Sequence, residues 1–532
     1  MKEIFQNKRN INILLVISFL LALTFRFREE IAYPDLDSDY YIQAMQTEDF
    51  MEGHGFTSRY IRLNDISDVK YIMHGTWPVG LPIILLPLCH ITNLVNAIVI
   101  VQLLSVMLLL FSLLRIFKIL ELNKLTLFLF LLFTSFNLSY SYSFITDKLA
   151  AAIFLFAMGF ALEAGTGKSM SVIKEVGVGV LLFCTMSLRY AYIANIVIIP
   201  VFFAFTGIAK HQWKLIYTGL KIFVFAAIPA FIFFNAFKIN QQHTGFISQL
   251  AHLNFNWSSL KQCSPFPSRT FFDPFPIYRH MPLTSSFKFY LLVEYIISGL
   301  VLGLLFWYFF LKRNWWERAK TNDPIASFTT LSCLAFLVIG SFLVFNTLTT
   351  IEGNTLYETR YFIVLTLIIQ VLFFTLIDQV IKKNVTIKAL PVFVWSLFVI
   401  STVYSIVISE SVSANVWHDT NVNERDHYWN GLEYKWYNTL NADAQKNKGI
   451  SIIITGYDRK YIDSPPGYSN GVCAIEQYDS LIDGNFHHSK PVIIYALIPA
   501  SLNAREKNFI SIYGAKQVLK SDQGEVYRAF LH

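Results

Sequence analysis

The sequence predicts an α-helical polytopic membrane protein that ends in a small α/β domain. Its 532 residues are 54% hydrophobic and only 15% charged, whereas an average soluble protein has about 25% charged residues. Apolar runs recur as far as residue 409, and most approach the roughly 20 apolar residues needed to cross a bilayer. This composition excludes a chain made only of ordinary soluble domains.

About 11 membrane spans are expected, with boundaries uncertain by a few residues. The first, 11–25, follows Lys2, Lys8 and Arg9. It lacks a cleavage site of small residues, so we expect an uncleaved span rather than a signal peptide. The later expected spans are 94–114, 125–145, 149–164, 176–192, 192–207, 222–237, 289–311, 326–347, 361–379 and 389–408.

Lys and Arg residues predict the orientation, because short cytoplasmic loops of membrane proteins are enriched in them. If the N-terminus is cytoplasmic, every cytoplasmic segment is basic. These segments contain Lys2, Lys8, Arg9, Arg115, Lys118, Lys124, Lys168, Lys174, Lys210, Lys214, Lys221, Lys312, Arg313, Arg318, Lys320, Lys382, Lys383 and Lys388. The net charge of +7 therefore reflects topology and indicates no nucleic-acid partner.

The odd number of spans places the C-terminus outside the cytoplasm. Compact loops favour a bacterial inner (plasma) membrane. We expect a transmembrane domain over 1–409, with outer loops at 28–93 and 239–285, and an extracytoplasmic α/β domain over 410–532. In this tail, β-branched runs bounded by turn residues predict strands. The expected elements are strands at 449–456, 490–497 and 525–530 and a helix at 504–513.

The outer loop 28–93 opens with three acidic residues, Asp35, Asp37 and Asp39. Such carboxylates can bind a divalent cation such as Mg²⁺ or Mn²⁺ through oxygen. Alternatively, one of them is a general base whose pKa is raised by its acidic neighbours. A third interpretation is a solvated turn in which Ser38 or Asp39 caps the helix that follows.

His74 and Trp77 stand in a Pro-rich stretch of the same loop, from His74 to Pro87, which predicts a short helix at the membrane interface rather than a span. His74 is a candidate metal ligand or acid/base group. The alternative is a histidine with no role in chemistry.

Four further charged positions are expected at the outer face: Asp147, Lys148, Arg189 and Arg360. A charge in the lipid core costs about 2.5–3.5 kcal/mol, so Arg189 should face a cavity or the interface. Arg360 opposes the positive-inside trend and would suit a phosphate ligand. The alternatives are a helix cap for Asp147 and a salt bridge from Arg360 to a nearby Glu.

Four motifs, in order along residues 10–410, resemble those of GT-C-type membrane glycosyltransferases. The likeness is to the branch containing protein O-mannosyltransferases and the aminoarabinose transferase acting on lipid A. The motifs are Asp37-Ser-Asp-Tyr-Tyr-Ile-Gln-Ala44, His74-Gly-Thr-Trp-Pro-Val-Gly-Leu-Pro82, Thr146-Asp-Lys-Leu149 and Glu358-Thr-Arg-Tyr361.

The resemblance implies inverting transfer of a sugar from a polyprenyl-phosphate donor, at the outer face, to a hydroxyl of a glycan, lipid or protein. It implies a general base at Asp37, with Asp39 second. Residues implied to bind the donor phosphate are Arg360, Arg189 and Lys148. Residues implied to contact substrate are Asp147, His74, Tyr361, Glu358 and Trp77.

Two other function classes fit parts of the sequence. A lipid-linked oligosaccharide polymerase or ligase would use a late outer loop with paired Arg residues, and the loop 239–285 contains Arg269 and Arg279. A non-enzymatic transporter or lipid flippase would place its charges near the middle of the membrane, in two related halves. Here the outer charges gather at one face and no halves repeat, which favours the transferase.

Overall fold

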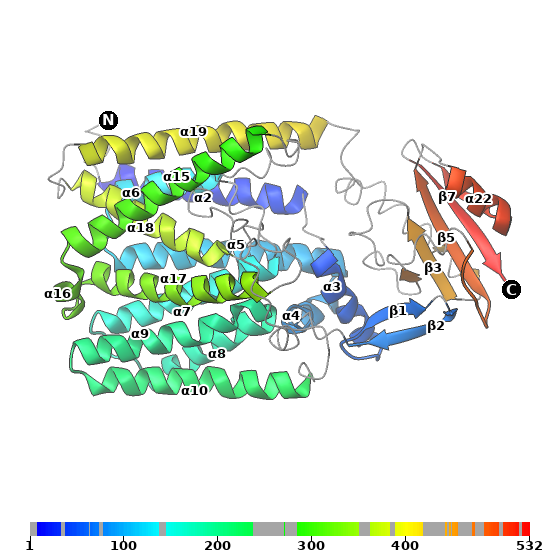
Figure 1. Ribbon diagram of the computed structural model, residues 1–532, viewed down its shortest axis with the longest axis horizontal. Helices are drawn as coiled ribbons and strands as arrows, with labels where there is room; N and C mark the ends of the chain where they lie inside the picture. The colour runs from blue at the N-terminus through cyan, green and yellow to red at the C-terminus, as the bar shows by residue number, and fades with distance from the viewer. Residues whose placement is uncertain are drawn as a thin grey trace. The chain divides into compact units, whose positions relative to one another are not determined.

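The protein forms two compact units in the computed structural model, and each is described by itself (Figure 1). The first comprises residues 1–30 and 102–417, and the second 31–101 and 418–532. The structure describes residues 8–32, 38–62, 64–73, 78–137, 145–237, 271, 285–349, 362–382, 389–418, 442–443, 446–447, 450–455, 471–473, 484–499, 504–520 and 524–532.

The first unit is a helical bundle in which a described helix overlaps each of the expected spans. Three of them, α2, α5 and α19, continue into the second unit. The helices are α2 (Lys8–Ala32), α5 (Leu94–Ile119), α6 (Lys124–Phe136), α7 (Ile145–Gly165), α8 (Val172–Leu188), α9 (Asn195–Ala209), α10 (Trp213–Ala236), α15 (Ser285–Phe306), α16 (Trp315–Ala319), α17 (Pro324–Thr349), α18 (Ile363–Ile381) and α19 (Ala389–His418).

Among the described residues, 8 helices are long and apolar enough to cross a membrane. The other three expected spans coincide with α2, α6 and α8. The apolar parts of α2 and α6 are shorter, at Asn12–Phe27 and Lys124–Ser135, and α8 has 17 residues. The helical membrane architecture is therefore confirmed. Within the described residues, length and composition support eight of the roughly 11 expected spans.

Helix α18 is the most deeply buried helix of the bundle, since every residue from Ile363 to Val380 is buried. Its continuous apolar sequence is compatible with contact to other helices on all sides. On α18, Phe374 packs edge-on against Phe130 and Phe133 of α6, with ring centroids 5.2 and 5.6 Å away. Such edge-to-face aromatic pairs add to the packing energy.

Helices α9 and α10 approach each other closely at Gly219. A Cβ atom there would lie 2.8 Å from the carbonyl oxygen of Pro200 and 2.9 Å from Cβ of Phe203, both on α9. Small residues allow membrane helices to pack at short distance. Gly219 therefore permits this close contact because it has no side chain.

The basic turns lie together at one end of the bundle, which we call the basic end. Lys210, after α9, donates to the carbonyl oxygen of Gly165 at 2.6 Å and to Asn322 Oδ1 at 3.0 Å. Lys382, after α18, donates to the carbonyl oxygen of Glu121 at 3.1 Å. These contacts join turns that the positive-inside pattern assigned to one side, and they place the last residues of α7 and α9 together and those of α5 and α18 together.

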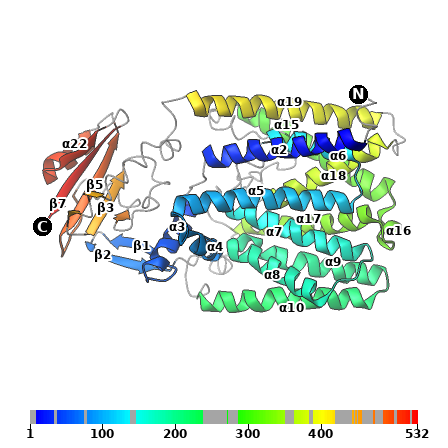
Figure 2. The same cartoon turned by 180° about the vertical axis from the view of Figure 1, so that it is seen from behind.

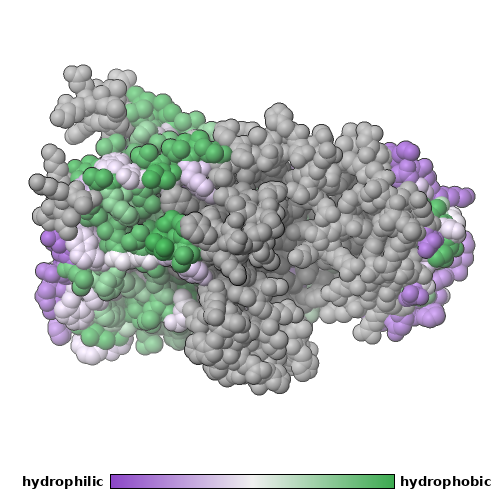
Figure 3. All heavy atoms as spheres, turned by 45° about the horizontal axis from the view of Figure 1, so that its top comes forward, coloured by the Kyte–Doolittle hydropathy of each residue, from purple (hydrophilic) through white to green (hydrophobic). Residues whose placement is uncertain are grey.

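The described surface of the helical unit is largely apolar, with hydrophilic residues concentrated at its edge (Figure 3). Exposed apolar side chains are frequent on α10, where Phe231 is 71% and Ile232 60% exposed. Exposure of so many apolar side chains to water would be unfavourable, whereas their contact with lipid is favourable.

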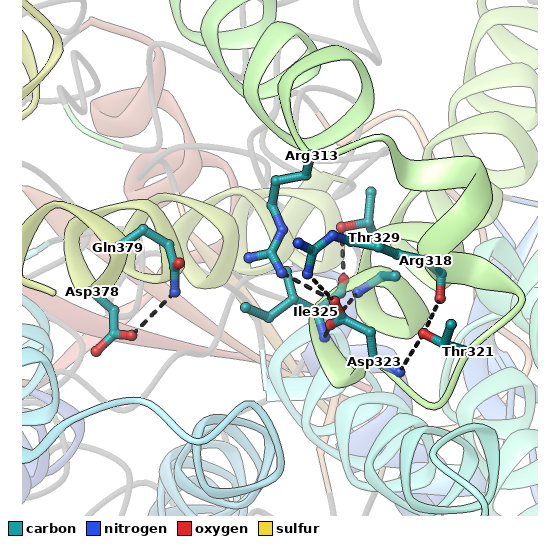
Figure 4. A network of polar contacts seen from close by, with 9 residues as sticks. Arg313, Arg318, Thr321, Asp323, Ile325, Thr329, Asp378 and Gln379 are labelled. Carbon is teal, nitrogen blue, oxygen red and sulfur yellow. Dashed lines mark hydrogen bonds and ion pairs between the residues drawn. The ribbon is translucent and has the colours of Figure 1, made fainter. Parts of the chain in front are cut away.

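Asp323 organises the turn before α17 at the basic end (Figure 4). Its Oδ1 accepts hydrogen bonds from the backbone N–H groups of Ile325 and Ala326, at 2.8 and 3.2 Å, which caps the helix. Its Oδ2 accepts from Arg313 at 3.1 Å and Arg318 at 2.9 Å. Burial would raise the pKa of Asp323, but the hydrogen bond from Arg318 and the charge of Arg313 outweigh it and lower the pKa.

The second unit contains a five-stranded sheet in the order β4-β3-β5-β7-β6, in which β4, β3 and β5 are parallel and the other pairs antiparallel. This confirms the small C-terminal sheet. The remaining elements are a helix-hairpin-helix segment and one helix of the tail. The elements are α3 (Ser38–Met51), β1 (Ser58–Arg62), β2 (Asp65–Ile72), α4 (Gly80–Cys89), β3 (Ile450–Thr455), β4 (Gly471–Cys473), β5 (Val492–Pro499), α22 (Ala504–Tyr513), β6 (Lys516–Lys520) and β7 (Gly524–Leu531).

The β1–β2 hairpin of the first outer loop packs on the C-terminal sheet (Figures 1 and 2). Ile66 is 0% exposed and belongs to one apolar cluster with Ile494 of β5, Phe509 of α22 and Ala529 of β7. Contacts therefore group 31–101 with 418–532, whereas the sequence analysis divided the chain between residues 409 and 410. The cause is a long-range contact that local composition does not record.

We expect Gly219→Ala to lower the thermal midpoint of the purified protein in detergent, because the added methyl group overlaps α9. Overpacking of this kind costs about 1–3 kcal/mol. Gly303→Ala on α15 is the matched control, since its Cβ would meet nothing within 4 Å. It should leave the midpoint unchanged or raise it, because Ala is the better helix former. Equal midpoints for the two variants would contradict the close contact.

We expect Asp323→Asn to destabilise the protein at neutral pH by about 1–3 kcal/mol, the usual contribution of hydrogen bonds to a charged group. Asn keeps the cap oxygen but loses the charge that holds the two arginines. Because the folded-state pKa is lowered, this stabilisation is present above the unfolded pKa of about 3.9 and is lost as pH falls below it. Thermal midpoints of both proteins from pH 7 to pH 3 should converge, and a constant difference would refute this assignment.

Candidate active site

Three of the predicted site residues have described side chains: Asp147, Lys148 and Arg189. Asp39 lies in the first turn of α3, but nothing is described of its side chain. The other predicted residues lie outside the described residues. These are Asp37, His74, Trp77, Glu358, Arg360 and Tyr361.

Asp147 and Arg189 form a buried ion pair. Nη1 of Arg189 lies 3.2 Å from Oδ2 of Asp147, and the two side chains are 9% and 0% exposed. Asp147 stands in the first turn of α7, where a negative charge is favoured by the helix dipole. Arg189 follows the last residue of α8 in an extended conformation, with φ −158° and ψ 125°. Arg189, which we expected to face a cavity or the interface, is paired with Asp147 inside the bundle.

Tyr192 and Lys148 complete this buried polar group. The hydroxyl of Tyr192, in the 3₁₀ turn Tyr190–Ala194, donates to the carbonyl oxygen of Asp147 at 3.3 Å. Lys148 is only 1% exposed. The start of α7, the end of α8 and the turn before α9 are therefore joined by polar contacts at one end of the bundle.

The charge of this group suits an anionic ligand. Arg189 pairs with the Asp147 carboxylate, Lys148 is a second buried cation next to it in the sequence, and helix N-termini such as that of α7 carry partial positive charge. A buried charge is tolerated only when it is paired and hydrogen-bonded. The group can consequently act in either of two ways, as a structural tie between α7 and α8 or as a site that holds a phosphate.

Sequence reasoning missed three buried polar residues of the same unit. Arg26 of α2 is 1% exposed, and its Nη2 donates to the carbonyl oxygen of Ser135 at 2.7 Å. Asn195, the first residue of α9, and Gln102 of α5 are also buried. Among the described parts of the chain, the amide groups of Asn195 and Gln102 have no hydrogen-bond partner.

A sequence signal exists for one of these three residues. Arg26 follows an apolar run at the end expected to face outward, so it opposes the positive-inside trend in the same way as Arg360. Asn195 and Gln102 stand singly in apolar runs, and polarity alone does not distinguish a buried amide from one that faces a neighbouring helix.

The metal prediction concerns Asp37 and Asp39, whose side chains the structure does not describe. Within the described ranges, no group of three or more His, Cys, Asp or Glu residues is close enough to hold a metal ion. Asp147 lies beside Arg189, and a neighbouring cation disfavours a second positive ion. The Asp147 carboxylate is therefore a poor ligand for a metal ion.

The fold and this buried group define a multi-pass helical membrane protein with a polar centre at one end of its bundle. No family model and no curated protein matches the sequence. ArnT from Cupriavidus metallidurans bound to undecaprenyl phosphate is similar over 96% of this chain and 97% of that chain, at 12% identity and a TM-score of 0.49.

Two further solved structures are similar. ArnT from the same organism in the apo state has 12% identity and a TM-score of 0.48, over 96% of this chain and 97% of that chain. The archaeal oligosaccharyltransferase AglB from Archaeoglobus fulgidus, in complex with an inhibitory peptide and a dolichol-phosphate, has 11% identity and a TM-score of 0.44. That alignment covers 91% of this chain and 69% of AglB. The chemistry of this chain rests on its own residues.

We expect Arg189→Met to destabilise the protein by about 3–5 kcal/mol, because it leaves the Asp147 carboxylate buried without its cation. Asp147→Asn should cost a similar amount by leaving Arg189 uncompensated. The double variant should be more stable than the sum of the two losses predicts, since it removes both charges. Thermal unfolding of all four proteins measures the coupling, and additive losses would show that the pair does not interact.

Proposed function

We propose that this protein is a membrane glycosyltransferase. It moves a sugar from a polyprenyl-phosphate donor to an acceptor hydroxyl at the outer face of the membrane, with inversion at the anomeric carbon. The acceptor belongs to a glycan, a lipid or a protein. The proposed membrane is the bacterial inner membrane, with the N-terminus in the cytoplasm and the C-terminus outside.

The observation that carries this proposal is the buried Asp147–Arg189 pair, with the buried Lys148 next to Asp147 in the sequence. Gly165, at the other end of α7, contacts Lys210 at the basic end of the bundle. The Asp147–Arg189 pair therefore stands at the end opposite the basic turns. By the positive-inside pattern this is the outer end, where buried cations are unexpected and need a reason. An anionic ligand reached from the membrane supplies one.

The chemistry requires a base and a cationic site for the leaving group. Asp37, with Asp39 second, is proposed to take the proton from the acceptor hydroxyl as its oxygen bonds to the anomeric carbon. The bond between that carbon and the phosphate oxygen breaks, and the electron pair leaves with the lipid phosphate. Arg189, Lys148 and Arg360 are proposed to stabilise the developing phosphate charge, the electrostatic contribution that usually dominates catalysis.

The remaining predicted residues are assigned to substrate positioning. Asp147 orients Arg189 through their ion pair and so acts on the phosphate indirectly. Trp77 and Tyr361 are proposed to stack on a sugar ring, and His74 and Glu358 to hydrogen-bond its hydroxyl groups. Arg360 precedes Phe362 by two positions, and from Phe362 the chain enters the buried helix α18. A divalent metal at Asp37 and Asp39 remains a proposal.

We expect the purified protein to release polyprenyl phosphate from radiolabelled lipid-linked sugars in the presence of an acceptor. Asp37→Asn should reduce kcat by about 10²–10⁴-fold, the contribution typical of a general base. Scintillation counting of the released lipid phosphate, separated by chromatography, provides the measurement. Asp68→Asn is the matched control, because Asp68 is an exposed carboxylate on the same segment and pairs with Lys70 at the surface.

Turnover that survives both Asp37→Asn and Asp39→Asn would refute the base assignment. Absence of turnover by the wild type with any lipid-linked sugar, in a preparation that retains its thermal transition, would refute the transferase. Addition of EDTA followed by Mg²⁺ or Mn²⁺ decides whether a metal contributes.

A further inference from the structure

A hydrogen-bonded cluster fastens the hairpin of the first outer loop to the C-terminal sheet. We call it the latch, and it consists of Asp65 and Ser67 of β2 and Ser489 before β5. Oδ2 of Asp65 accepts from the hydroxyl of Ser489 at 2.6 Å, and Oδ1 accepts from its backbone N–H at 3.2 Å. Oδ1 also accepts from the hydroxyl of Ser67 at 2.5 Å. One carboxylate thus joins residues 424 positions apart.

Backbone and apolar contacts extend the latch. The N–H of Ile66 donates to the carbonyl oxygen of His487 at 2.8 Å, and the N–H of Lys490 donates to the hydroxyl of Ser67 at 3.1 Å. The side chain of Ile66 is fully buried in the core of the C-terminal sheet. Apolar burial combined with charge-assisted hydrogen bonds fixes the orientation of the hairpin on the sheet. A single contact between exposed side chains would not do so.

The hairpin in turn holds α3. His54, after α3, stacks on Tyr71 of β2 with ring centroids 3.7 Å apart. The hydroxyl of Thr57 donates to the buried carboxylate of Asp49 at 3.2 Å. On the other side, Nε2 of Gln43 donates to the carbonyl oxygen of Pro78 at 2.8 Å. Helix α3 is therefore fixed at both its middle and its end by this outer segment.

Helix α3 begins at Ser38, directly after Asp37, and its first turn contains Asp39. An α-helix is rigid over this length, so a displacement of its far end is transmitted to its first turn. A proton acceptor must be held to within a fraction of an ångström, and a misplacement of about 1 Å can cost a factor of about 100 in rate. The start of α3 thus needs a fixed support.

We propose that the C-terminal domain is a positioning element for the acidic segment, and that Asp65 is its positioning residue. The latch fixes the hairpin, the hairpin fixes α3, and the first turn of α3 contains Asp39, with Asp37 directly before the helix in the sequence. The catalytic consequence rests on the proposed function, while the mechanical link does not.

The charge of Asp65 suits a permanent latch. Hydrogen bonds from Ser489 and Ser67 lower the pKa of Asp65 far below its usual range. The carboxylate therefore stays ionised throughout the physiological range, and the latch does not open by titration of Asp65.

The mechanical link is tested by hydrogen–deuterium exchange of the full-length protein in detergent. Asp65→Ala should accelerate amide exchange in β2 and also in α3. Asp68→Ala is the matched control on the same strand: its carboxylate is 51% exposed and pairs with Lys70 at 2.6 Å. It should leave the exchange of α3 unchanged. Exchange in α3 that does not respond to Asp65→Ala would overturn the proposal.

A disulfide can replace the latch, because the hydroxyl oxygens of Ser67 and Ser489 are 3.1 Å apart. The Asp65→Ala protein should lose about 10- to 100-fold in kcat, with the KM for the lipid donor unchanged. Adding Ser67→Cys and Ser489→Cys and oxidising the pair should restore both kcat and the exchange protection of α3. Reduction with dithiothreitol should abolish the rescue.

The outcomes separate this proposal from the proposed function. Accelerated exchange in α3 with an unchanged kcat would overturn the positioning role even if the transferase is correct. Loss of turnover on oxidation would overturn it too, since it would show that the latch must open. If the wild type transfers no sugar, the transferase fails, and the exchange experiment alone decides whether the tail fixes α3.

Discussion

The cost of placing charge in lipid is the constraint on which this structure depends. Lys and Arg residues are concentrated in the turns at the basic end of the bundle. There Lys210 and Lys382 donate hydrogen bonds to backbone carbonyl oxygens at the ends of other helices. Charges inside the bundle occur in contact with opposite charges or carbonyl groups, as for Arg189 with Asp147 and Arg26 with Ser135. Because a carboxylate and a guanidinium stabilise each other there, the protein can keep a polar group within an apolar bundle.

This constraint also explains why so much of the helical unit was predictable. An apolar run long enough to cross a bilayer has few other structures open to it, since its backbone must be hydrogen-bonded within the helix. The expected spans accordingly overlap with helices, and the short helix expected in the stretch from His74 to Pro87 corresponds to α4 (Gly80–Cys89). Helix α6 covers only the first part of the span expected at 125–145. The helix ends at Phe136, because Asn137 has an extended conformation.

The second unit was less predictable, because its stability depends on pairs far apart in sequence. Three strands and the helix of the tail follow from β-branched runs and turn residues, but β4 and β6 are short and carry little pattern. No sequence feature near Asp65 predicts its contact with Ser489. The sequence around Ile66 is equally compatible with a solvent-facing residue on a hairpin. At the candidate site, Asp147 and Arg189 were predicted separately from their sidedness. That they form a pair is seen only in the structure, where α7 and α8 bring them together.

The grouping of 31–101 with 418–532 has a consequence for biosynthesis. The outer hairpin is made early, yet Ser489 is translated 424 residues after Asp65. At about 5–20 residues per second, the ribosome needs on the order of 20–80 s to cover that distance. Throughout this interval Ile66 lacks the apolar partners of the sheet, while all later helices enter the bilayer. The apolar surface around Ile66 thus stays incomplete until Ser489 and the strands of the C-terminal sheet have been made.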